Sequence, residues 1–297
     1  MPLTTIEAIR SDDVAGLTYC RALEAGQILL FPRAPFELPA GDRAFLLTRR
    51  QAGAGYHKNI AYRPQRDRVT GVVKQAADDA DRLRHILRDY SRRVAGFAAT
   101  LLPTYARAWR LDFASFRPQE EAGRSLPPHA RNDRLHVDAF PTRPSGGDRI
   151  LRVFTNINPT ADRVWLTGDN FERLAERFAL SSGLLPAVQR PSLARRLRRL
   201  ARSLGLPVTV RSPYDSFMMG FHHFLKGNLE YQQAAQTERL AFPPASTWLV
   251  FTDMVSHAVL SGQYALEQTF IVPRESLALP EKAPIAILER IAGAKLA

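Results

Sequence analysis

Two stretches decide the fold expected of this chain: RLHVDAF at Arg134–Phe140 and WLVFTDMVSHAVL at Trp248–Leu260. In the first, His136 and Asp138 are two residues apart, and residues i and i+2 of a β-strand point to the same face. In the second, His257 lies in an apolar segment rich in β-forming residues. Two imidazoles and one carboxylate brought together in this way are the residue types of a facial-triad metal site.

A facial triad holds one face of an octahedral metal ion and leaves the other positions open. That arrangement suits non-haem Fe(II), which must bind an oxoacid and O₂ together. Taken alone, His136 and Asp138 could equally form a hydrogen-bonded pair on a strand. The distant His257 in a similar β-rich context favours the metal centre, so we predict that His136, Asp138 and His257 are metal ligands.

Composition limits the class of protein. The chain has 297 residues, 45% of them apolar and 24% charged, which is ordinary for a folded domain and excludes a largely disordered chain. The single cysteine, Cys20, cannot form an internal disulfide. No apolar stretch is long enough to span a bilayer, and the first residues do not resemble a signal peptide. We therefore expect a cytoplasmic protein.

The patterning predicts a β core flanked by helices. Prolines end a predicted strand at 26–35, a polar stretch at 49–75 predicts a long loop, and apolar residues at helical spacing predict a helix over 76–109 that Pro103 kinks or ends. Segments rich in β-branched and aromatic residues predict further strands at 112–118, 134–140, 149–157, 246–255 and 264–272. Helical patterns at 170–236 indicate an insertion into this β core. The expected class is α+β with a mainly β core.

The order of these motifs, from about residue 115 to 273, resembles the Fe(II)/2-oxoglutarate-dependent dioxygenases. That resemblance implies a double-stranded β-helix, also called a jelly-roll or cupin-like fold, with Fe(II) as cofactor and 2-oxoglutarate and O₂ as co-substrates. It also implies that His136, Asp138 and His257 take the metal-ligand positions. The domain expected is a single one over 1–297: an N-terminal strand and helices at 1–111, the jelly-roll core at about 112–273 with the insertion at about 170–236, and a C-terminal tail at 274–297.

Longer runs resemble a narrower family. The runs HVDAFPTRPSGGDRILRVFTNINP, YDSFMMGFHHFLKGNLEYQQ and FTDMVSHAVLSGQYALEQTFIVP resemble the bacterial 3-deoxy-D-manno-oct-2-ulosonic acid (Kdo) hydroxylases. This implies hydroxylation at C3 of the outer Kdo sugar of Kdo-lipid A, giving D-glycero-D-talo-oct-2-ulosonic acid, in lipopolysaccharide core biosynthesis. The substrate would be a polyanion in a membrane, which agrees with the formal net charge of +12.

The 2-oxoglutarate carboxylate needs a cation. Many dioxygenases place an arginine shortly after the second histidine, but the run ALEQT at 265–269 has none. Others place the cation on the strand after the His-x-Asp pair. We therefore predict Arg152, with Gln268 as a neutral helper and Arg117 on an earlier strand as the second candidate, because a guanidinium matches a carboxylate with two parallel hydrogen bonds.

Substrate residues are predicted from the helical segment around HHFLKGNLEY. His222 and His223 are adjacent, so they cannot both face one metal on a helix. One of them is expected to be structural, and the other to line a sugar-acid site. The candidates that we name are His57, His223, Lys226 and Tyr231, and an ordinary surface position is the simpler expectation for His57.

A basic amphipathic segment spans residues 190–211, where leucines recur on one helical face. The pattern fits two interpretations equally: a solvated helix that packs through its leucines, or an anchor on the anionic inner-membrane surface. The arginines concerned are Arg195, Arg196, Arg198, Arg199 and Arg202. Nucleic acid is the third choice, because no aromatic residues alternate with these arginines.

Two other functions remain open at this stage. One is a dioxygenase that acts on nucleic acid or protein, with the positive charge serving phosphate contacts. The other is a non-catalytic jelly-roll that binds an anionic glycolipid, although such a module has no need of an open iron site. The oligomeric state cannot be predicted from the sequence.

Overall fold

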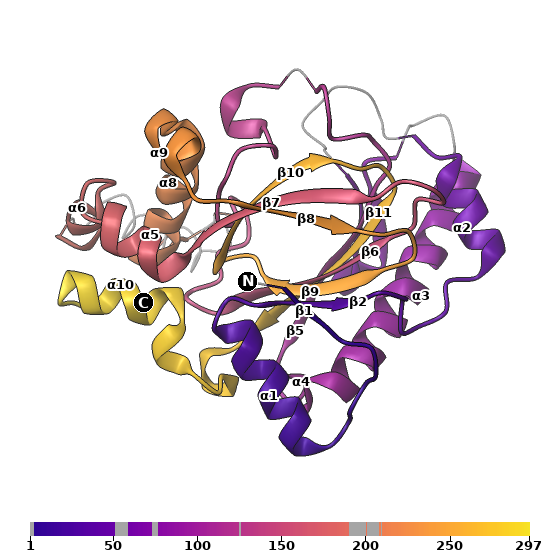
Figure 1. Ribbon diagram of the computed structural model, residues 1–297, viewed down its shortest axis with the longest axis horizontal. Coiled ribbons are helices and arrows are strands. Elements are labelled where there is room, and N and C mark those ends of the chain that lie inside the picture. Colours follow the sequence, from indigo (N-terminus) through magenta and orange to yellow (C-terminus); the bar gives the residue numbers. More distant parts are fainter. Residues whose placement is uncertain are drawn as a thin grey trace.

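The computed structural model describes residues 3–50, 59–72, 77–124, 126–189, 200, 208 and 210–297. Its strands form two facing sheets, and its helices lie outside them (Figure 1). Within these ranges, every helix is too short or too polar to cross a lipid bilayer.

The larger sheet has eight strands in the order β1-β2-β9-β6-β11-β5-β3-β4. All neighbours pair antiparallel except β1 and β2, which are parallel. The strands are β1 (Leu3–Thr5), β2 (Ile28–Phe31), β3 (Ile60–Arg63), β4 (Arg68–Thr70), β5 (Arg110–Arg117), β6 (Arg149–Asn156), β9 (Thr247–Phe251) and β11 (Ala265–Val272).

The smaller sheet has three antiparallel strands in the order β10-β7-β8. They are β7 (Arg163–Asn170), β8 (Glu238–Phe242) and β10 (Val255–Ser261). A compact apolar cluster fills the space between the sheets, and its members come from β2, β6, β7, β8, β9 and β10. The small sheet therefore covers only one half of the large sheet. The inner face of β11, β5 and β3 contributes no residue to this cluster and is not covered by the small sheet.

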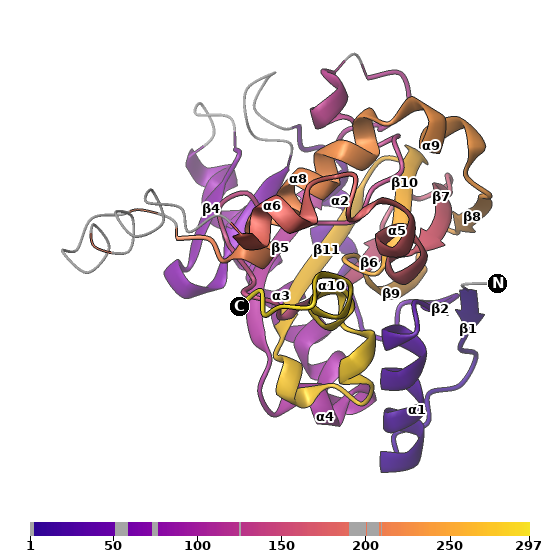
Figure 2. The ribbon, with the colours of Figure 1, turned by 90° about the vertical axis from the view of Figure 1, so that its left-hand side faces the viewer.

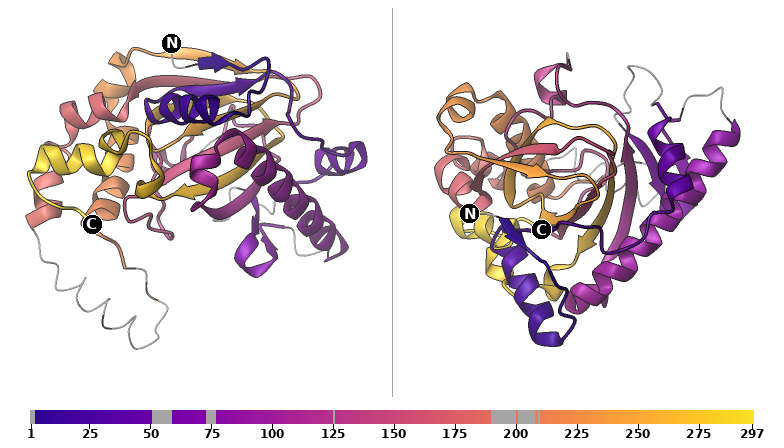
Figure 3. Two further views of the ribbon diagram at one scale, coloured as in Figure 1. Left: turned by 90° about the horizontal axis from the view of Figure 1, so that it is seen from below. Right: turned by 45° about the vertical axis from the view of Figure 1, so that its right-hand side comes forward.

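Helices surround the two sheets in two groups. In the first, α1 (Asp13–Glu24) and α3 (Ala77–Leu101) contact strands of the large sheet, while α4 (Pro103–Ala106) packs on both of them and α2 (Ala40–Leu47) lies beside α3 (Figure 3). The second gathers at one end of the strands and contains α5 (Phe171–Phe178), α6 (Leu184–Gln189), α8 (Pro213–Gly227), α9 (Leu229–Ala234) and α10 (Pro284–Ala292) (Figure 2). This second group carries the region predicted as a helical insertion.

Several sequence predictions hold at the level of single elements. Strands β5, β6 and β11 coincide with three predicted strands to within about two residues, the usual uncertainty of an element boundary. The predicted helix over 76–109 divides at Leu102, because Pro103 cannot donate the backbone hydrogen bond that would continue α3. The division into one domain with an insertion and a tail stays a prediction.

Other predictions were wrong. The segment 134–140 was predicted as a strand, but it forms only one isolated bridge, between His136 and His257. The pairing with β10 does not continue, because the amide of Asp138 donates to the carbonyl of Thr252, which precedes β10. The strand predicted over 246–255 ends at Phe251, and a turn separates it from β10, which carries His257.

The loop predicted over 49–75 contains the β3–β4 hairpin, whose connection places Asp67 in the left-handed region at φ 41°. Strands β7 and β8 were not predicted at all. The C-terminal segment described as a tail contains helix α10, which packs on α5.

Candidate active site

Two of the three predicted metal ligands, His136 and His257, pair where the segment 134–140 crosses β10, and the third, Asp138, lies beside His136. The amide of His136 donates to the carbonyl of His257 at 3.1 Å, and the reverse bond is 2.9 Å. The two imidazole centroids are 4.7 Å apart. Asp138, two residues further on, lies with its Oδ1 3.7 Å from Nε2 of His136. The backbone therefore brings together side chains that are more than a hundred residues apart in the sequence.

Each imidazole at this crossing is fixed by a backbone carbonyl. The Nδ1 atoms of His136, His257 and His222 lie 2.7, 2.8 and 2.8 Å from the carbonyl oxygens of Arg134, Val255 and Val137 respectively. An Nδ1–H that donates to a carbonyl fixes the tautomer and leaves the Nε2 lone pair available. All three rings are thus prepared to present Nε2 to a metal ion or to a hydrogen-bond donor.

His222 is the histidine that the sequence analysis did not select. It comes from α8, its ring lies edge-on to His136 with centroids 4.9 Å apart, and one ligand atom each from His136, Asp138 and His222 lie within 4.8 Å of one another. His223, the residue named from sequence, points outward towards His129. Helical spacing could have identified His222 as the buried histidine of the pair, because it shares the buried side of α8 with Met218 and Leu225.

Burial keeps these imidazoles neutral. Desolvation lowers the pKa of His136 well below its ordinary value, lowers that of His257, and lowers that of His222 to about 3. For Asp138, burial is the largest influence and acts to raise the pKa, but Arg152 and the three neighbouring histidines together outweigh it and the pKa falls. Neutral imidazoles and an ionised carboxylate are the protonation states that a divalent metal needs.

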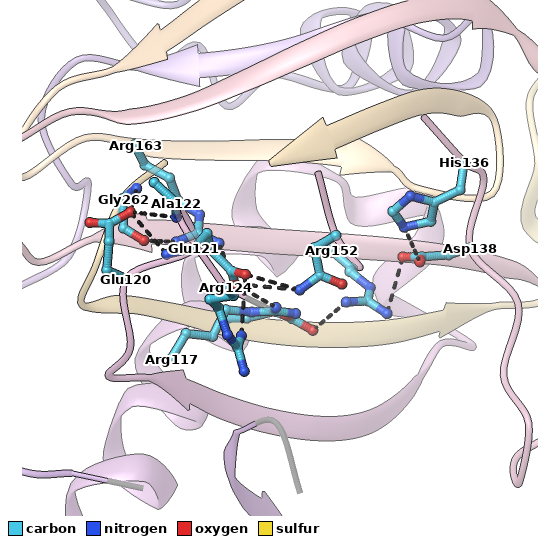
Figure 4. Close-up of polar contacts among 12 residues, drawn as sticks. Arg117, Glu120, Glu121, Ala122, Arg124, His136, Asp138, Arg152, Arg163 and Gly262 are labelled. Atoms are coloured by element: carbon cyan, nitrogen blue, oxygen red, sulfur yellow. Dashed lines mark hydrogen bonds and ion pairs between the residues drawn. The ribbon is translucent and has the colours of Figure 1, made fainter. Parts of the chain in front are cut away.

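A chain of ion pairs runs from the metal site across the inner face of the large sheet (Figure 4). Arg152 on β6 contacts Asp138 at 3.1 Å and Glu267 at 2.8 Å. Glu267 on β11 also accepts from Nε of Arg117 on β5 at 3.0 Å, and Arg117 reaches Glu121 at 3.9 Å. Glu267 is buried, and the two arginines lower its pKa although burial opposes them. Both predicted 2-oxoglutarate arginines therefore belong to one network that ends at the metal site.

The network continues to the loop after β10. Glu121 pairs with the buried Arg163 at 3.4 Å, and Arg163 donates to the carbonyl of Gly262 at 2.9 Å. The carboxylate of Glu120 accepts from the amide of Gly262 at 2.6 Å (Figure 4). These contacts hold the segment that follows β5 against the start of β7 and the loop that follows β10.

Of the remaining predicted residues, Lys226 lies near the predicted metal site, where its charge lowers the pKa of His136, whereas Gln268 and Tyr231 are bonded to other groups. Gln268 faces the opposite side of β11 from Glu267, and its amide donates to the carbonyls of Asp112 and Thr269. The hydroxyl of Tyr231 is 2.7 Å from that of Ser256. Lys226 is buried on α8, with Nζ 3.5 Å from the carbonyl of His129. His57, Arg195, Arg196, Arg198, Arg199 and Arg202 lie outside the described residues.

Comparison with known proteins identifies close relatives. A family model for 3-deoxy-D-manno-oct-2-ulosonic acid (Kdo) hydroxylases matches residues 8–295. The apo structure of the Kdo hydroxylase KdoO, a non-haem Fe(II) α-ketoglutarate-dependent dioxygenase, is 36% identical, with a TM-score of 0.85 over 100% of this chain and 97% of that one. No curated protein gives a significant match.

Ligand-bound structures of KdoO are equally similar. The complex with α-ketoglutarate and Fe(III) is 35% identical, with a TM-score of 0.85, and the match covers 100% of this chain and 98% of that one. The cobalt(II) complex is 36% identical, also with a TM-score of 0.85, over 100% and 97% of the two chains.

Proposed function

The chain belongs to the Kdo hydroxylase family, and on that premise we propose that it uses Fe(II), 2-oxoglutarate and O₂ to hydroxylate C3 of the outer Kdo sugar of Kdo-lipid A. The observation that carries the proposal is the convergence of His136, His257 and Asp138, with both imidazoles presenting Nε2. Fold and family agree with a non-haem Fe(II)/2-oxoglutarate-dependent dioxygenase.

His136, Asp138 and His257 are proposed as the iron ligands. The donor set fits, because two neutral imidazoles and one carboxylate are what a facial triad requires. When bound, iron with 2-oxoglutarate and O₂ supplies the oxidising power for hydroxylation of a C–H bond. The chain positions the His257 imidazole and excludes water from this side of the site. Trp165 stacks on His257 with ring centroids 5.0 Å apart, and Trp165 belongs to the apolar cluster between the sheets.

Arg152 is proposed to bind the distal carboxylate of 2-oxoglutarate, with Arg117 beside it. The support is position, since Arg152 already touches the proposed ligand Asp138 and a guanidinium edge suits a carboxylate. Gln268 is not included in this proposal, because its amide is engaged on the other face of β11.

The glycolipid is proposed to approach from α8. Desolvation is the main cause of the lowered pKa values of His136 and His222, and the charge of the nearby Lys226 lowers both further. His223 is exposed on the same helix. Contact with the cytoplasmic face of the inner membrane is proposed from the net charge of +12 and from the exposed Leu180 and Leu185, which precede the arginine-rich stretch in sequence.

The test is an anaerobic titration with Fe(II) and 2-oxoglutarate, followed by exposure to air with Kdo-lipid A and mass spectrometry. We expect one added oxygen atom per glycolipid with a matching amount of succinate. His136→Ala is expected to abolish the product, and His85→Ala, on the exposed side of α3, is the matched control.

Two results would redirect the proposal. Tight binding of Fe(II) and 2-oxoglutarate with an unchanged glycolipid would leave a dioxygenase with another substrate, such as nucleic acid or protein. Binding of neither would mean that the three ligands are wrong, and a glycolipid-binding module would replace the enzyme.

A further inference from the structure

Arginines and phenylalanines alternate in a column that leads outward from the metal site. The guanidinium carbon of Arg152 lies 5.5 Å from the ring centroid of Phe140, and that of Arg143 lies 4.2 Å from the same ring. Arg143 also lies 3.9 Å from the ring of Phe113, and Arg63 lies 4.9 Å from it. We call Arg152, Phe140, Arg143, Phe113 and Arg63 the arginine–phenylalanine column.

The column is built on different elements, so its order is a property of the fold. Arg152 belongs to β6, Phe113 to β5 and Arg63 to the end of β3, one residue beyond the pairing of Tyr62 with Ala114. Phe140 and Arg143 come from the segment that follows the metal ligand Asp138. The column therefore begins at the metal site and follows the half of the large sheet that the small sheet does not cover.

The guanidinium groups of the column lie close to aromatic rings, which attract a cation electrostatically. The donors of each guanidinium lie in one plane and can bind an oxyanion there. Arg143 keeps 31% of its side chain exposed, and Arg63 is half-buried. The result is a row of partly desolvated donors that are held in place before any ligand arrives.

Hydrogen-bond partners occupy only part of the column. Arg143 contacts Asp112, and Nε of Arg63 is buried without a hydrogen-bond partner among the described residues. Desolvation, followed by repulsion from Arg152, lowers the pKa of Arg143 to about 10. An oxyanion is the ligand that such partly engaged guanidinium donors favour.

We propose that the outer part of the arginine–phenylalanine column, Arg143 and Arg63 with Phe113 between them, is a subsite for a second oxyanion of the glycolipid, a carboxylate or phosphate carried outside the sugar that is oxidised. Arg152, at the inner end of the column, remains the arginine proposed for 2-oxoglutarate. This inference rests on the proposed function for the identity of the substrate. The column would fix the remote part of the glycolipid and so direct one sugar, rather than its neighbour, to the metal.

The test compares three variants with one control. Arg143→Gln and Arg63→Gln remove one column charge each, and Phe113→Leu keeps every charge but removes the ring between the two arginines. Arg10→Gln removes an arginine that is 77% exposed and follows β1, the strand at the opposite edge of the large sheet from β3 and β4. Circular dichroism and thermal melting identify any variant that fails to fold.

The first readout is equilibrium binding of inorganic pyrophosphate to the metal-free protein by calorimetry. A charge-assisted hydrogen bond at a partly exposed site is worth about a tenfold change in affinity. We expect binding about tenfold weaker in Arg143→Gln and Arg63→Gln, several-fold weaker in Phe113→Leu, and unchanged in Arg10→Gln. Equal binding in all four proteins would overturn the proposal, whether or not the proposed function holds.

The second readout is the KM for Kdo-lipid A, with and without its phosphates, beside the affinity for 2-oxoglutarate. A raised KM for both lipids assigns the column to a sugar carboxylate, and a rise only for the phosphorylated lipid assigns it to a phosphate. A loss of 2-oxoglutarate affinity with unchanged KM for the lipid would assign the column to the co-substrate and refute the subsite. A wild-type protein that hydroxylates no Kdo glycolipid would remove the proposed function and, with it, the identity of the ligand, while the pyrophosphate result still decides the oxyanion site.

Discussion

Replacing Arg152 by glutamine tests the link between the ion-pair network and the metal site. The side chain is 12% exposed and bonds two carboxylates, Glu267 at 2.8 Å and Asp138 at 3.1 Å. Removing one member of a buried ion pair costs about 3–5 kcal/mol because the partner is left buried without compensation. Glu267 keeps Arg117, so we expect the lower end, about 3 kcal/mol, in the free energy of unfolding of the metal-free protein.

The same substitution has a second, separable effect on 2-oxoglutarate. If Arg152 forms the two parallel hydrogen bonds proposed for the distal carboxylate, losing them costs about 2–5 kcal/mol, or roughly thirty-fold and upward in dissociation constant. Stability is measured by urea denaturation, and co-substrate affinity by anaerobic titration of the Fe(II)-loaded protein. Arg152→Lys keeps the charge without the fork, and should recover part of the stability but little of the affinity.

A surface arginine serves as the control for Arg152→Gln. Arg110→Gln removes a surface arginine that is 65% exposed and pairs with Asp148 at 3.3 Å, so stability should change by less than about 1 kcal/mol. A 2-oxoglutarate affinity unchanged in Arg152→Gln but lost in Arg117→Gln would transfer the role to Arg117. An unchanged free energy of unfolding would mean that the buried pairs are not formed in solution.

Three further substitutions probe other parts of the molecule. His222→Ala should weaken Co(II) binding about 10- to 100-fold, because its ring supports the ligand segment, whereas His223→Ala should leave the visible-absorption titration unchanged; equal effects would refute the assignment. Gly262→Ala should destabilise the chain by about 1–3 kcal/mol in thermal melts, since φ is +120° and a Cβ would lie 2.8 Å from Cα of Arg163; a neutral result would show that the loop relaxes. Hydrogen bonds from Lys282 and Arg290 lower the pKa of Glu172. The ionised carboxylate therefore stabilises the fold by up to about 1 kcal/mol above its unfolded-state pKa, and this stabilisation is lost as the pH falls through the folded-state pKa. Glu172→Gln should be less stable than the wild type at neutral pH and equally stable in acid, and a difference that does not change with pH would contradict this.

Local patterns predicted the elements whose signal is contained in their own residues. Strands β6 and β11 are rich in β-branched and aromatic residues, and the break after Leu101 follows from Pro103 alone. The hairpin of β3 and β4 was taken for a loop because its strands are only four and three residues long, and β3 is held in the sheet by pairing with β5. The bridge at His136 is similar, since the partner strand β10 and the carbonyl of Thr252 decide where the pairing stops.

The site divides in the same way. His136, Asp138 and His257 were selected because their spacing has a chemical meaning, and Arg152 because it stands on the strand that follows them. His222 was passed over because its role depends on how α8 docks against the segment after His136, and no local pattern specifies that docking. Glu267 was also not found, because a glutamate in an apolar strand gives no sign of the two arginines that neighbouring strands bring to it.

The charges inside the sandwich explain why the arginine count alone was a weak guide to function. Arg117, Arg152 and Arg163 are engaged with Glu121, Glu267 or Asp138, so these cations form a rigid support rather than a surface for polyanions. What distinguishes Arg152 is that one of its partners is also a proposed metal ligand. A carboxylate that binds a metal has less charge to offer a guanidinium, so metal loading should leave Arg152 freer to receive an anion. The position of Asp138 between the metal site and Arg152 therefore gives a physical reason for the co-substrate to bind after the metal, in addition to direct chelation.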